Sequence, residues 1–338
     1  MIFWWITNAI TERFRLQRWR KSIPLVIGGW GSRGKSGTER LKAAMIQGMG
    51  YSLFAKTTGC EAMMVAGIPG APPEELFLYR PYDKASITEQ RMVLKHAAQF
   101  DAQVLLWECM ALNPRYVNIL QNDWMKDDFT TLTNTYPDHE DIQGPTGLDV
   151  AQTISQFIPT KGHVVTTEQH MSPILRQKAW ERSSILREQS VLDWRLLGRD
   201  VLDLLPYNEH PKNIALVLGL ADELGIPRDQ ALWSFGKFII PDIGVLKSYG
   251  PIQIDGREVS FTNGMSANER AGFLSNWTRS QFSKPPDPLK PVFQVVMFNN
   301  RADRLPRQSI FASIAAMDTQ ANLMLVIGSN VDSFYDEW

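Results

Sequence analysis

The stretch that decides the fold of this chain reads Gly29-Trp-Gly-Ser-Arg-Gly-Lys-Ser36, which matches the pattern G-x-x-x-x-G-K-[ST] in full. The apolar run Pro24–Ile27 precedes it, and a helical pattern over Lys35–Met49 follows it. A glycine-rich turn between a strand and a helix is the context in which this pattern binds a nucleotide. Glycines let backbone N–H groups close around phosphate oxygens, and the helix start adds positive potential. The stretch therefore predicts a P-loop.

The side chains of this loop have separate expected roles. Lys35 is expected to reach the β- and γ-phosphates of ATP, and the Ser36 hydroxyl is expected to ligate Mg²⁺. The alternative is a chance glycine-rich turn that binds no nucleotide, and the flanking strand and helix make it the weaker interpretation. The residues expected to bind the nucleotide here are Gly31, Ser32, Arg33, Gly34, Lys35, Ser36 and Gly37.

Short apolar strands alternate with helical stretches on both sides of the P-loop. This alternation predicts an α/β fold with a mostly parallel sheet and helices on both faces. Ligands of such sheets lie beyond the carboxyl ends of the strands. The expected strands of this sheet are Pro24–Ile27, Tyr51–Ala55, Val104–Trp107, Phe129–Thr133 and His163–Thr166.

A domain junction is predicted at Pro241–Gly244, which reads PDIG. Domains usually have about 100–200 residues, so a chain of 338 residues is expected to hold two. We predict a basic aromatic N-terminal helix over residues 1–22, a P-loop ATP-binding domain over 23–242, and a smaller α/β domain over 243–338.

Composition excludes several classes of protein. The formal net charge is −1, so no overall field draws the chain to nucleic acid. Two cysteines, Cys60 and Cys109, are too few for a disulfide framework or a cysteine-rich zinc site, and they fit a reducing compartment. The five histidines form no HExxH motif.

The first 21 residues combine an apolar run, MIFWWITNAI, with the basic segment TERFRLQRWRK. The apolar run has about half the length that spans a bilayer. Tryptophans beside arginines are typical of a helix that lies in the membrane interface. The alternative is a helix that packs on its own protein or on a partner subunit.

Two further polar residues follow expected strands. Glu108 comes directly after the strand that ends at Trp107, where a carboxylate can hold Mg²⁺ beside phosphates. His139 lies in the segment Thr133–Gly144 after the next strand, where it could meet a metal or a phosphate. Taken alone, Glu108 is better explained as a surface or paired acid, and a lone histidine is more often structural than catalytic.

The order of four motifs resembles the Mur ligase superfamily, and within it the ligase component of poly-γ-glutamate synthase (the CapB or PgsB type). The resemblance covers the chain from about residue 23 to its end. Shorter matches are ASITEQ at 85–90, residues 211–227, FTNGMSANE at 261–269 and FNNRADR at 298–304. The four motifs are GSRGKS at 31–36, KTTG at 56–59, WECMA at 107–111 and TNTYPDHEDIQG at 133–144.

The resemblance implies roles for individual residues. Ser36 and Glu108 would ligate one Mg²⁺, and Glu108 and His139 a second, so that Lys35, Glu108 and His139 form the catalytic set. Many Mur ligases carry a carbamoylated lysine after the histidine motif, but no lysine occurs here between His139 and Lys161. The C-terminal domain is expected to be shorter than in the family. Its residues that would approach the nucleotide are Asn263, Asn268, Arg301 and Arg304.

The implied reaction is an ATP-dependent ligation in which a phosphorylated carboxylate is attacked by an amine, as in poly-γ-glutamate synthesis. The implied substrate is an amino acid or a glutamyl chain, and the implied setting is cytoplasmic, at the inner face of the cell membrane with membrane-protein partner subunits. A homo-oligomer is also expected. Two alternatives stay open: another P-loop enzyme such as a small-molecule kinase, and a non-catalytic nucleotide-binding subunit that docks through residues 1–21.

Overall fold

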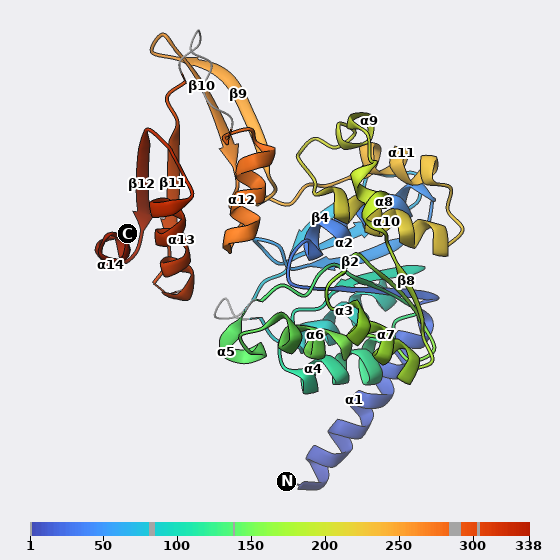
Figure 1. The fold of residues 1–338 in the computed structure, drawn as a ribbon. Coiled ribbons are helices and arrows are strands. Elements are labelled where there is room, and N and C mark those ends of the chain that lie inside the picture. The colour runs from blue at the N-terminus through green and yellow to red at the C-terminus, as the bar shows by residue number, and fades with distance from the viewer. Residues whose placement is uncertain (1, 81–84, 138, 284–291, 303–304) are drawn as a thin grey trace. The chain divides into compact units, whose positions relative to one another are not determined.

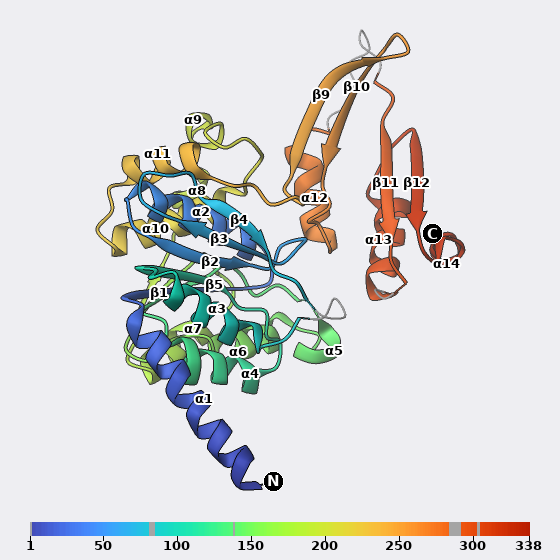
Figure 2. The same ribbon diagram turned by 180° about the vertical axis from the view of Figure 1, so that it is seen from behind.

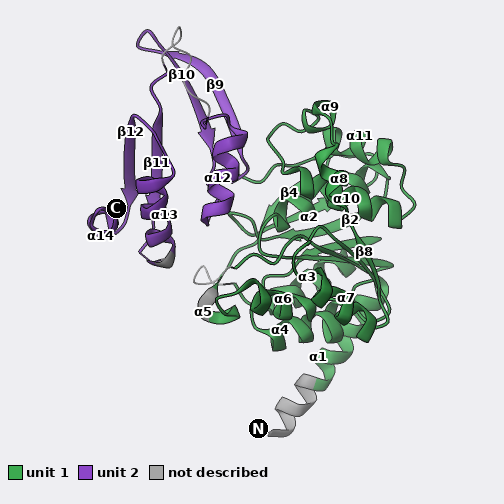
Figure 3. Cartoon of the chain, viewed as in Figure 1, with its two compact units in different colours: residues 1–243 green, residues 244–338 purple. Residues whose placement is uncertain are grey.

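The chain divides after Ile243 into two units, residues 1–243 and residues 244–338 (Figure 3). The computed structural model describes residues 2–80, 85–137, 139–283, 292–302 and 305–338. The N-terminal unit contains the P-loop and the large sheet, and the C-terminal unit has a small core of its own.

Within the described ranges, the sheet of the N-terminal unit has eight strands in the order β4-β3-β2-β5-β1-β6-β7-β8 (Figure 1). Strand β3 pairs antiparallel with both β2 and β4 at one edge, and the other neighbours pair parallel. The strands are β1 (Leu25–Trp30), β2 (Leu53–Thr57), β3 (Met63–Gly67), β4 (Glu74–Phe77), β5 (Val104–Glu108), β6 (Phe129–Leu132), β7 (His163–Thr166) and β8 (Ile185–Glu188).

Continuous apolar runs explain the parallel centre of this sheet. Val26 and Ile27 in β1 and Leu105 and Leu106 in β5 are fully buried, as expected for strands that are covered on both faces. The expected α/β class is confirmed. Strands β3 and β4, which add the two antiparallel pairs, were not predicted. Strand β4 is exposed along its length and has no alternation of buried and exposed residues that would reveal a strand.

Helices cover both faces of the sheet, as the view from behind also shows (Figure 2). On one face α2, α10 and α11 pack together, and on the other α3, the π-helical turn η2, α4, α6 and α7 form the layer. The first group is α2 (Lys35–Gly48), α10 (Pro211–Glu223) and α11 (Arg228–Phe238). The second group is α3 (Glu89–Gln99), α4 (Pro114–Asn118), η2 (Ile119–Met125), α6 (Gly147–Ser155) and α7 (Ser172–Glu181). Short helices in the connections are α5 (Glu140–Gln143), α8 (Val191–Arg195) and α9 (Arg199–Leu202).

The N-terminal helix α1 (Ile2–Ser22) packs against α3 and η2. Its contact side carries the buried Leu16 and the half-buried Trp19, and Ile23 follows in the same core. Arg20 donates to the backbone carbonyls of Met125 and Lys126, which close the end of η2. The spacing of three and four residues along the contact side is that of one helix face.

The C-terminal unit contains a hairpin and a parallel strand pair. Strands β9 (Lys247–Ile254) and β10 (Arg257–Asn263) pair antiparallel, and β11 (Val295–Asn300) and β12 (Leu323–Gly328) pair parallel. Phe298, Ala312 and Phe334 contribute to the core between the strand pair and the helices. These helices are α12 (Arg270–Arg279), α13 (Leu305–Met317) and α14 (Val331–Glu337).

Candidate nucleotide and metal site

The P-loop connects the end of β1 to the start of α2, at the centre of the sheet between β5 and β6. Gly34 lies at the N-cap of α2 with φ +85°, and the first helical hydrogen bond is donated by the Thr38 amide to its carbonyl. Helix geometry leaves the N–H groups of residues 35–37 without an intrahelical acceptor. These groups stand at the positive end of the helix dipole, where an anion is stabilised.

Neighbouring side chains fill the space beside two glycines of the loop. A Cβ atom at Gly31, whose φ is +139°, would lie 2.0 Å from Thr133 Oγ1. A Cβ atom at Gly34 would lie 2.4 Å from Asn213 Oδ1. Both the backbone conformation and the lack of space therefore require glycine at these positions.

Asn134 clamps the middle of the P-loop from the segment that follows β6. The Ser32 amide donates to the Asn134 carbonyl at 2.9 Å, and the Arg33 amide donates to Asn134 Oδ1 at 3.0 Å. Asn134 Nδ2 donates in return to the Arg33 carbonyl at 2.9 Å. Because these two amides have acceptors on Asn134, Ser32 and Arg33 are held in the shape of the loop. The binding of phosphate by residues 31–37 stays a prediction.

The Lys35 side chain folds back across the loop. Its Nζ donates to the carbonyls of Gly31 at 2.8 Å and Ser32 at 3.1 Å. The ammonium group therefore lies over the glycine-rich turn, where a flexible side chain can exchange carbonyl oxygens for phosphate oxygens.

Ser36 and Glu108 meet at the carboxyl edge of the sheet. Ser36 Oγ donates to Glu108 Oε2 at 2.8 Å, and the Glu108 side chain is almost completely buried. The Thr58 amide donates to the same carboxylate oxygen at 2.8 Å, and the Thr58 hydroxyl donates to Oε1. The structure thus places together two of the three side chains that were expected to hold a metal.

The spacing of these two oxygens fits a magnesium ion. Mg²⁺ prefers octahedral oxygen ligands at about 2.0–2.1 Å, which places adjacent ligands about 2.9 Å apart. Ser36 Oγ and Glu108 Oε2 are joined by a hydrogen bond of 2.8 Å, a length close to that spacing. Among the residues that the structure describes, no three His, Cys, Asp or Glu side chains are grouped as a metal site. A cation here would complete its coordination with phosphate oxygens and water, as Mg²⁺ does beside nucleotides.

His139 stands at the start of α5 in the connection after β6. Its carbonyl accepts from the Ile142 and Gln143 amides at 2.9 Å, and its φ is +51°. A left-handed conformation is uncommon for a residue other than glycine and concentrates at functional sites. The pairing of His139 with Glu108 around a second metal stays a prediction.

A buried charged cluster, not predicted from the sequence, holds the backbone of Glu108. The Glu108 carbonyl accepts from Gln90 Nε2 at 3.2 Å and from Lys56 Nζ at 3.4 Å. Lys56 pairs at 3.7 Å with Glu89, which also binds Arg80 through both carboxylate oxygens. Burial lowers the pKa of Lys56. Its position in the KTTG motif, directly after an apolar strand, was the available signal.

A second cluster lies against the start of α2 and was also not predicted. Glu209 accepts from Tyr207 Oη at 2.9 Å and from Asn213 Nδ2 at 2.8 Å. A Cβ atom at Gly37 would lie 2.7 Å from Glu209 Oε2. Burial and the neighbouring Glu209 raise the pKa of Tyr207. The polar run before α10 was the only signal, and it resembles an ordinary helix cap.

Charged groups also lie beneath the P-loop. Lys42 pairs with Glu39 at 2.6 Å, and both side chains are fully buried. Lys42 Nζ also donates to the Gly28 carbonyl and to Thr131 Oγ1, at 3.2 and 3.0 Å. Burial raises the pKa of Glu39, and Lys42 opposes this shift. The pair ties α2 to β1 and β6 below the nucleotide loop.

The residues expected to approach the nucleotide from the second domain lie in the C-terminal unit. Asn263 is buried at the end of β10, and Asn268 accepts from Arg307 at 3.2 Å. Arg301 is exposed after β11. Arg304 lies outside the described residues. Their contact with the nucleotide stays a prediction.

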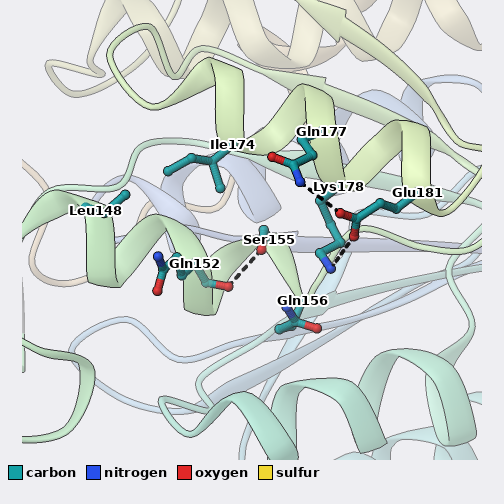
Figure 4. Close-up of a pocket in the computed structure, with 8 residues that line it drawn as sticks. All are labelled: Leu148, Gln152, Ser155, Gln156, Ile174, Gln177, Lys178 and Glu181. Atoms are coloured by element: carbon teal, nitrogen blue, oxygen red, sulfur yellow. Dashed lines mark hydrogen bonds and ion pairs between the residues drawn. The ribbon is translucent and has the colours of Figure 1, made fainter.

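A groove of about 380 Å³ lies between α6 and α7, away from these motifs in the sequence (Figure 4). Its lining includes no residue of the P-loop, and neither Glu108 nor His139. Glu181 accepts there from Gln177 and Lys178. The lining residues are Leu148, Gln152, Ser155, Gln156, Ile174, Gln177, Lys178 and Glu181.

Comparison with known sequences adds relatives that match almost the whole chain. PGA synthase CapB of Bacillus subtilis (strain 168) is 29% identical over 325 residues, which cover 96% of this chain and 79% of that protein. Capsule biosynthesis protein CapB of Bacillus anthracis is 31% identical over 324 residues, covering 96% of this chain and 67% of that protein. The family model of the poly-gamma-glutamate synthase CapB C-terminal domain matches residues 249–338.

Solved structures with the same fold come from two kinds of ligase. The folylpolyglutamate synthase of Thermotoga maritima has a TM-score of 0.62 at 12% identity, covering 97% of this chain and 82% of that one. Escherichia coli FolC in complex with DHPP and ADP has a TM-score of 0.57 at 14% identity, covering 96% and 90%. MurF from Acinetobacter baumannii has a TM-score of 0.62 at 11% identity, covering 96% and 68%. At these identities the likeness shows the shared fold.

Proposed function

The chain belongs to the family of poly-gamma-glutamate synthase CapB, and from this premise we propose that it is an ATP-dependent ligase that joins a carboxylate to an amine in poly-γ-glutamate synthesis. The observation that carries the proposal is the meeting of Ser36 with Glu108 at the end of a P-loop. That arrangement supports the proposal because it would set a phosphate cradle and a cation position side by side, as the reaction requires.

The residues of the chain have distinct tasks in this proposal. The amides of residues 34–37 and the Lys35 ammonium bind the phosphates of ATP. Ser36 and Glu108 would hold Mg²⁺, and Glu108 with His139 would hold a second ion. When bound, the metal neutralises charge on the phosphoryl oxygens. Thr58, Gln90 and Lys56 fix the carboxylate and the carbonyl of Glu108, so that its orientation is set before the substrate arrives.

The proposed ligation has two steps. A substrate carboxylate oxygen attacks the γ-phosphorus, the bond to the bridging oxygen breaks, and ADP leaves. The nitrogen of an amine then attacks the acyl carbon of the acyl phosphate, phosphate leaves, and the nitrogen loses a proton as the amide forms. Water must be excluded between the two steps, because it would hydrolyse the acyl phosphate. The proposed carboxylate is that of a glutamyl chain, and the proposed amine is that of glutamate.

Release of ADP tests the function directly. We expect the chain with ATP, Mg²⁺, glutamate and short γ-glutamyl peptides to release ADP and to form a peptide longer by one glutamate, detected by mass spectrometry. Lys35→Ala should reduce turnover by at least about 100-fold, since it removes a charge that acts on the transferred phosphoryl group. The exposed Lys95 of α3 supplies the matched control, Lys95→Ala, which should retain activity.

Other outcomes would select other functions. A phosphorylated product without an amide would identify a kinase. Binding of ATP without turnover, with glutamyl acceptors and partner subunits present, would identify a non-catalytic subunit. Undiminished turnover of Lys35→Ala would refute the proposed role of the P-loop.

We also propose that α1 attaches the protein peripherally to an anionic membrane surface, where partner subunits would be met. No helix in the described part of the chain is long and apolar enough to cross a membrane. Helix α1 exposes Phe14 together with basic residues, as a helix in the membrane interface would. The basic residues are Arg13, Arg15, Arg18 and Lys21.

Co-sedimentation with vesicles tests this attachment. Binding should be stronger to vesicles with anionic lipid than to neutral ones and should weaken with salt. Arg15→Glu with Arg18→Glu should abolish it. Arg195→Glu with Arg199→Glu, at exposed positions of α8 and α9, is the control for charge. Equal binding of both double variants would contradict the proposal.

A further inference from the structure

Three consecutive backbone amides after β2 donate hydrogen bonds to three different side chains. The Thr58 amide donates to Glu108 Oε2 at 2.8 Å, and the Gly59 amide donates to Ser36 Oγ at 2.9 Å. The Cys60 amide donates to Asp242 Oδ2 at 3.2 Å. The loop Thr58–Cys60 therefore joins both expected metal ligands to a residue that is distant from them in the sequence.

Asp242 lies at the end of the N-terminal unit, next to Ile243, after which the chain enters the C-terminal unit. Its carboxyl group is mostly buried, and Oδ1 accepts from the Ile243 amide at 2.9 Å. A Cβ atom at Gly59 would lie 2.3 Å from Asp242 Oδ2. The carboxyl group therefore packs directly on the backbone of the loop.

Arg40 of α2 contacts the segment that leads out of the N-terminal unit, residues 239–243, which we call the exit segment. Its buried guanidinium donates to the Ile240 carbonyl at 2.8 Å and to Glu75 at 2.6 Å, and it lies 3.8 Å from Asp242. The exit segment is therefore held by α2, which carries the P-loop lysine and serine, and by the loop that contacts the metal ligands.

We propose that Asp242 is a positioning residue that couples occupancy of the cation position at Ser36 and Glu108 to the exit segment. A cation held by Ser36 Oγ and Glu108 Oε2 would take lone pairs of the two atoms that now accept hydrogen bonds from the Gly59 and Thr58 amides. The adjacent Cys60 amide shares the same short run of planar peptide units, so a shift of the loop changes its hydrogen bond to Asp242. Because Asp242 belongs to the exit segment, a change in this hydrogen bond would also shift the exit segment.

This inference rests on the proposed function, because it requires a nucleotide with Mg²⁺ at the P-loop. Hydrogen exchange of the whole chain, followed by mass spectrometry, tests it without relying on turnover. The probe is the non-hydrolysable analogue AMPPNP, added with Mg²⁺ or with EDTA. In the unaltered chain we expect exchange at residues 239–246 to change when Mg²⁺ and the analogue are both present, and not with the analogue and EDTA.

Two substitutions of Asp242 separate the hydrogen bond from general stability. Asp242→Ala removes the acceptor and should abolish the exchange response while the analogue still binds. Asp242→Asn keeps an oxygen acceptor and should restore it. Glu75→Gln is the matched control, because it removes the other acid on Arg40 without touching the loop. We also expect Asp242→Ala to lower kcat by about 10-fold, with KM for ATP little changed.

A second variant covers the case in which Asp242→Ala does not fold. Gly59→Ala places a methyl group against the carboxyl group and should also abolish the response. Retention of the magnesium-dependent response in Gly59→Ala and in any folded Asp242→Ala protein would overturn the inference, as would its absence from the unaltered chain with the analogue bound. If the unaltered chain fails to bind the analogue with Mg²⁺ at all, the proposed function itself fails.

Discussion

At the scale of the residue, the P-loop is defined as much by what surrounds its glycines as by the motif. A Cβ atom at Gly28 would lie 1.9 Å from Asp127 Oδ2, and one at Gly29 would lie 1.8 Å from Glu39 Oε1. At Gly31 the neighbour is Thr133. The side chains of Asp127, Glu39 and Thr133 therefore leave no room for a side chain on the end of β1 or on the turn that follows it.

Gly31→Ala should weaken binding of MgATP by at least about tenfold, which corresponds to about 1.4 kcal/mol. The methyl group would displace Thr133 or the turn, and the positive φ is unfavourable for alanine. Gly50→Ala is the control, because Gly50 also has a positive φ but nothing lies within 4 Å of its added Cβ. Gly50→Ala should reduce stability by about 1 kcal/mol and leave binding intact. Equal affinities for the two variants, measured by isothermal titration calorimetry, would contradict this account.

At the scale of the element, one buried acid connects the strands below the site. Asp127 follows η2 and accepts from Trp107 Nε1 of β5 at 2.6 Å, from Gln121 Nε2 of η2 at 3.0 Å and from the Thr130 hydroxyl of β6 at 3.1 Å. Burial raises the pKa of Asp127 to about 7, although these hydrogen bonds oppose the shift. The hydrogen bonds of Asp127 therefore join β5, η2 and β6.

The raised pKa of Asp127 makes the stability of the folded state depend on pH. The folded state holds this proton up to about pH 7, whereas the unfolded chain releases it near the ordinary value of 3.8. The contribution of Asp127 is therefore fully present below 3.8 and is lost as pH rises through 7. We expect Asp127→Asn to be more stable relative to the unaltered chain at pH 7.5 than at pH 5, in urea unfolding curves. The exposed Asp123→Asn should show no such difference between the two pH values.

Some strands of the protein could be predicted from the sequence, and others could not. Strands β1, β5, β6 and β7 were expected near their observed positions, because each is a buried apolar run next to a helix. Strand β11 begins at Val295, after the exposed apolar residues Val292 and Phe293. Strands β3, β4 and β8 depend on pairing with neighbours, and local sequence carries little of that information.

At the scale of the whole molecule, the two units have separate hydrophobic cores. The proposed nucleotide position is surrounded by α2, the ends of β2, β5 and β6, and the polar run before α10, which all belong to the N-terminal unit. A ligand bound there should stabilise this unit in particular, because it binds the folded state and not the unfolded chain.

Calorimetry can measure this stabilisation. MgATP at 100 times its Kd should raise the free energy of unfolding of the N-terminal unit by about 2.7 kcal/mol, which raises its Tm by several degrees. A transition of the C-terminal unit should shift less. Lys35→Ala should remove the shift, and Lys95→Ala should retain it. A shift of the same size in Lys35→Ala would mean that ATP binds elsewhere.

The sequence by itself determined the P-loop, the α/β class, the position of Glu108 at a strand end and that of His139 in the segment after β6, because these follow from motif spacing and from local apolar runs. Only the tertiary structure decided that Ser36 and Glu108 share a hydrogen bond, that Asn134 occupies the Ser32 and Arg33 amides, and that Asp242 meets the loop after β2. These contacts join segments up to 182 positions apart in the chain. Such pairings depend on how the strands order themselves in the sheet, which a local pattern of residue types does not encode.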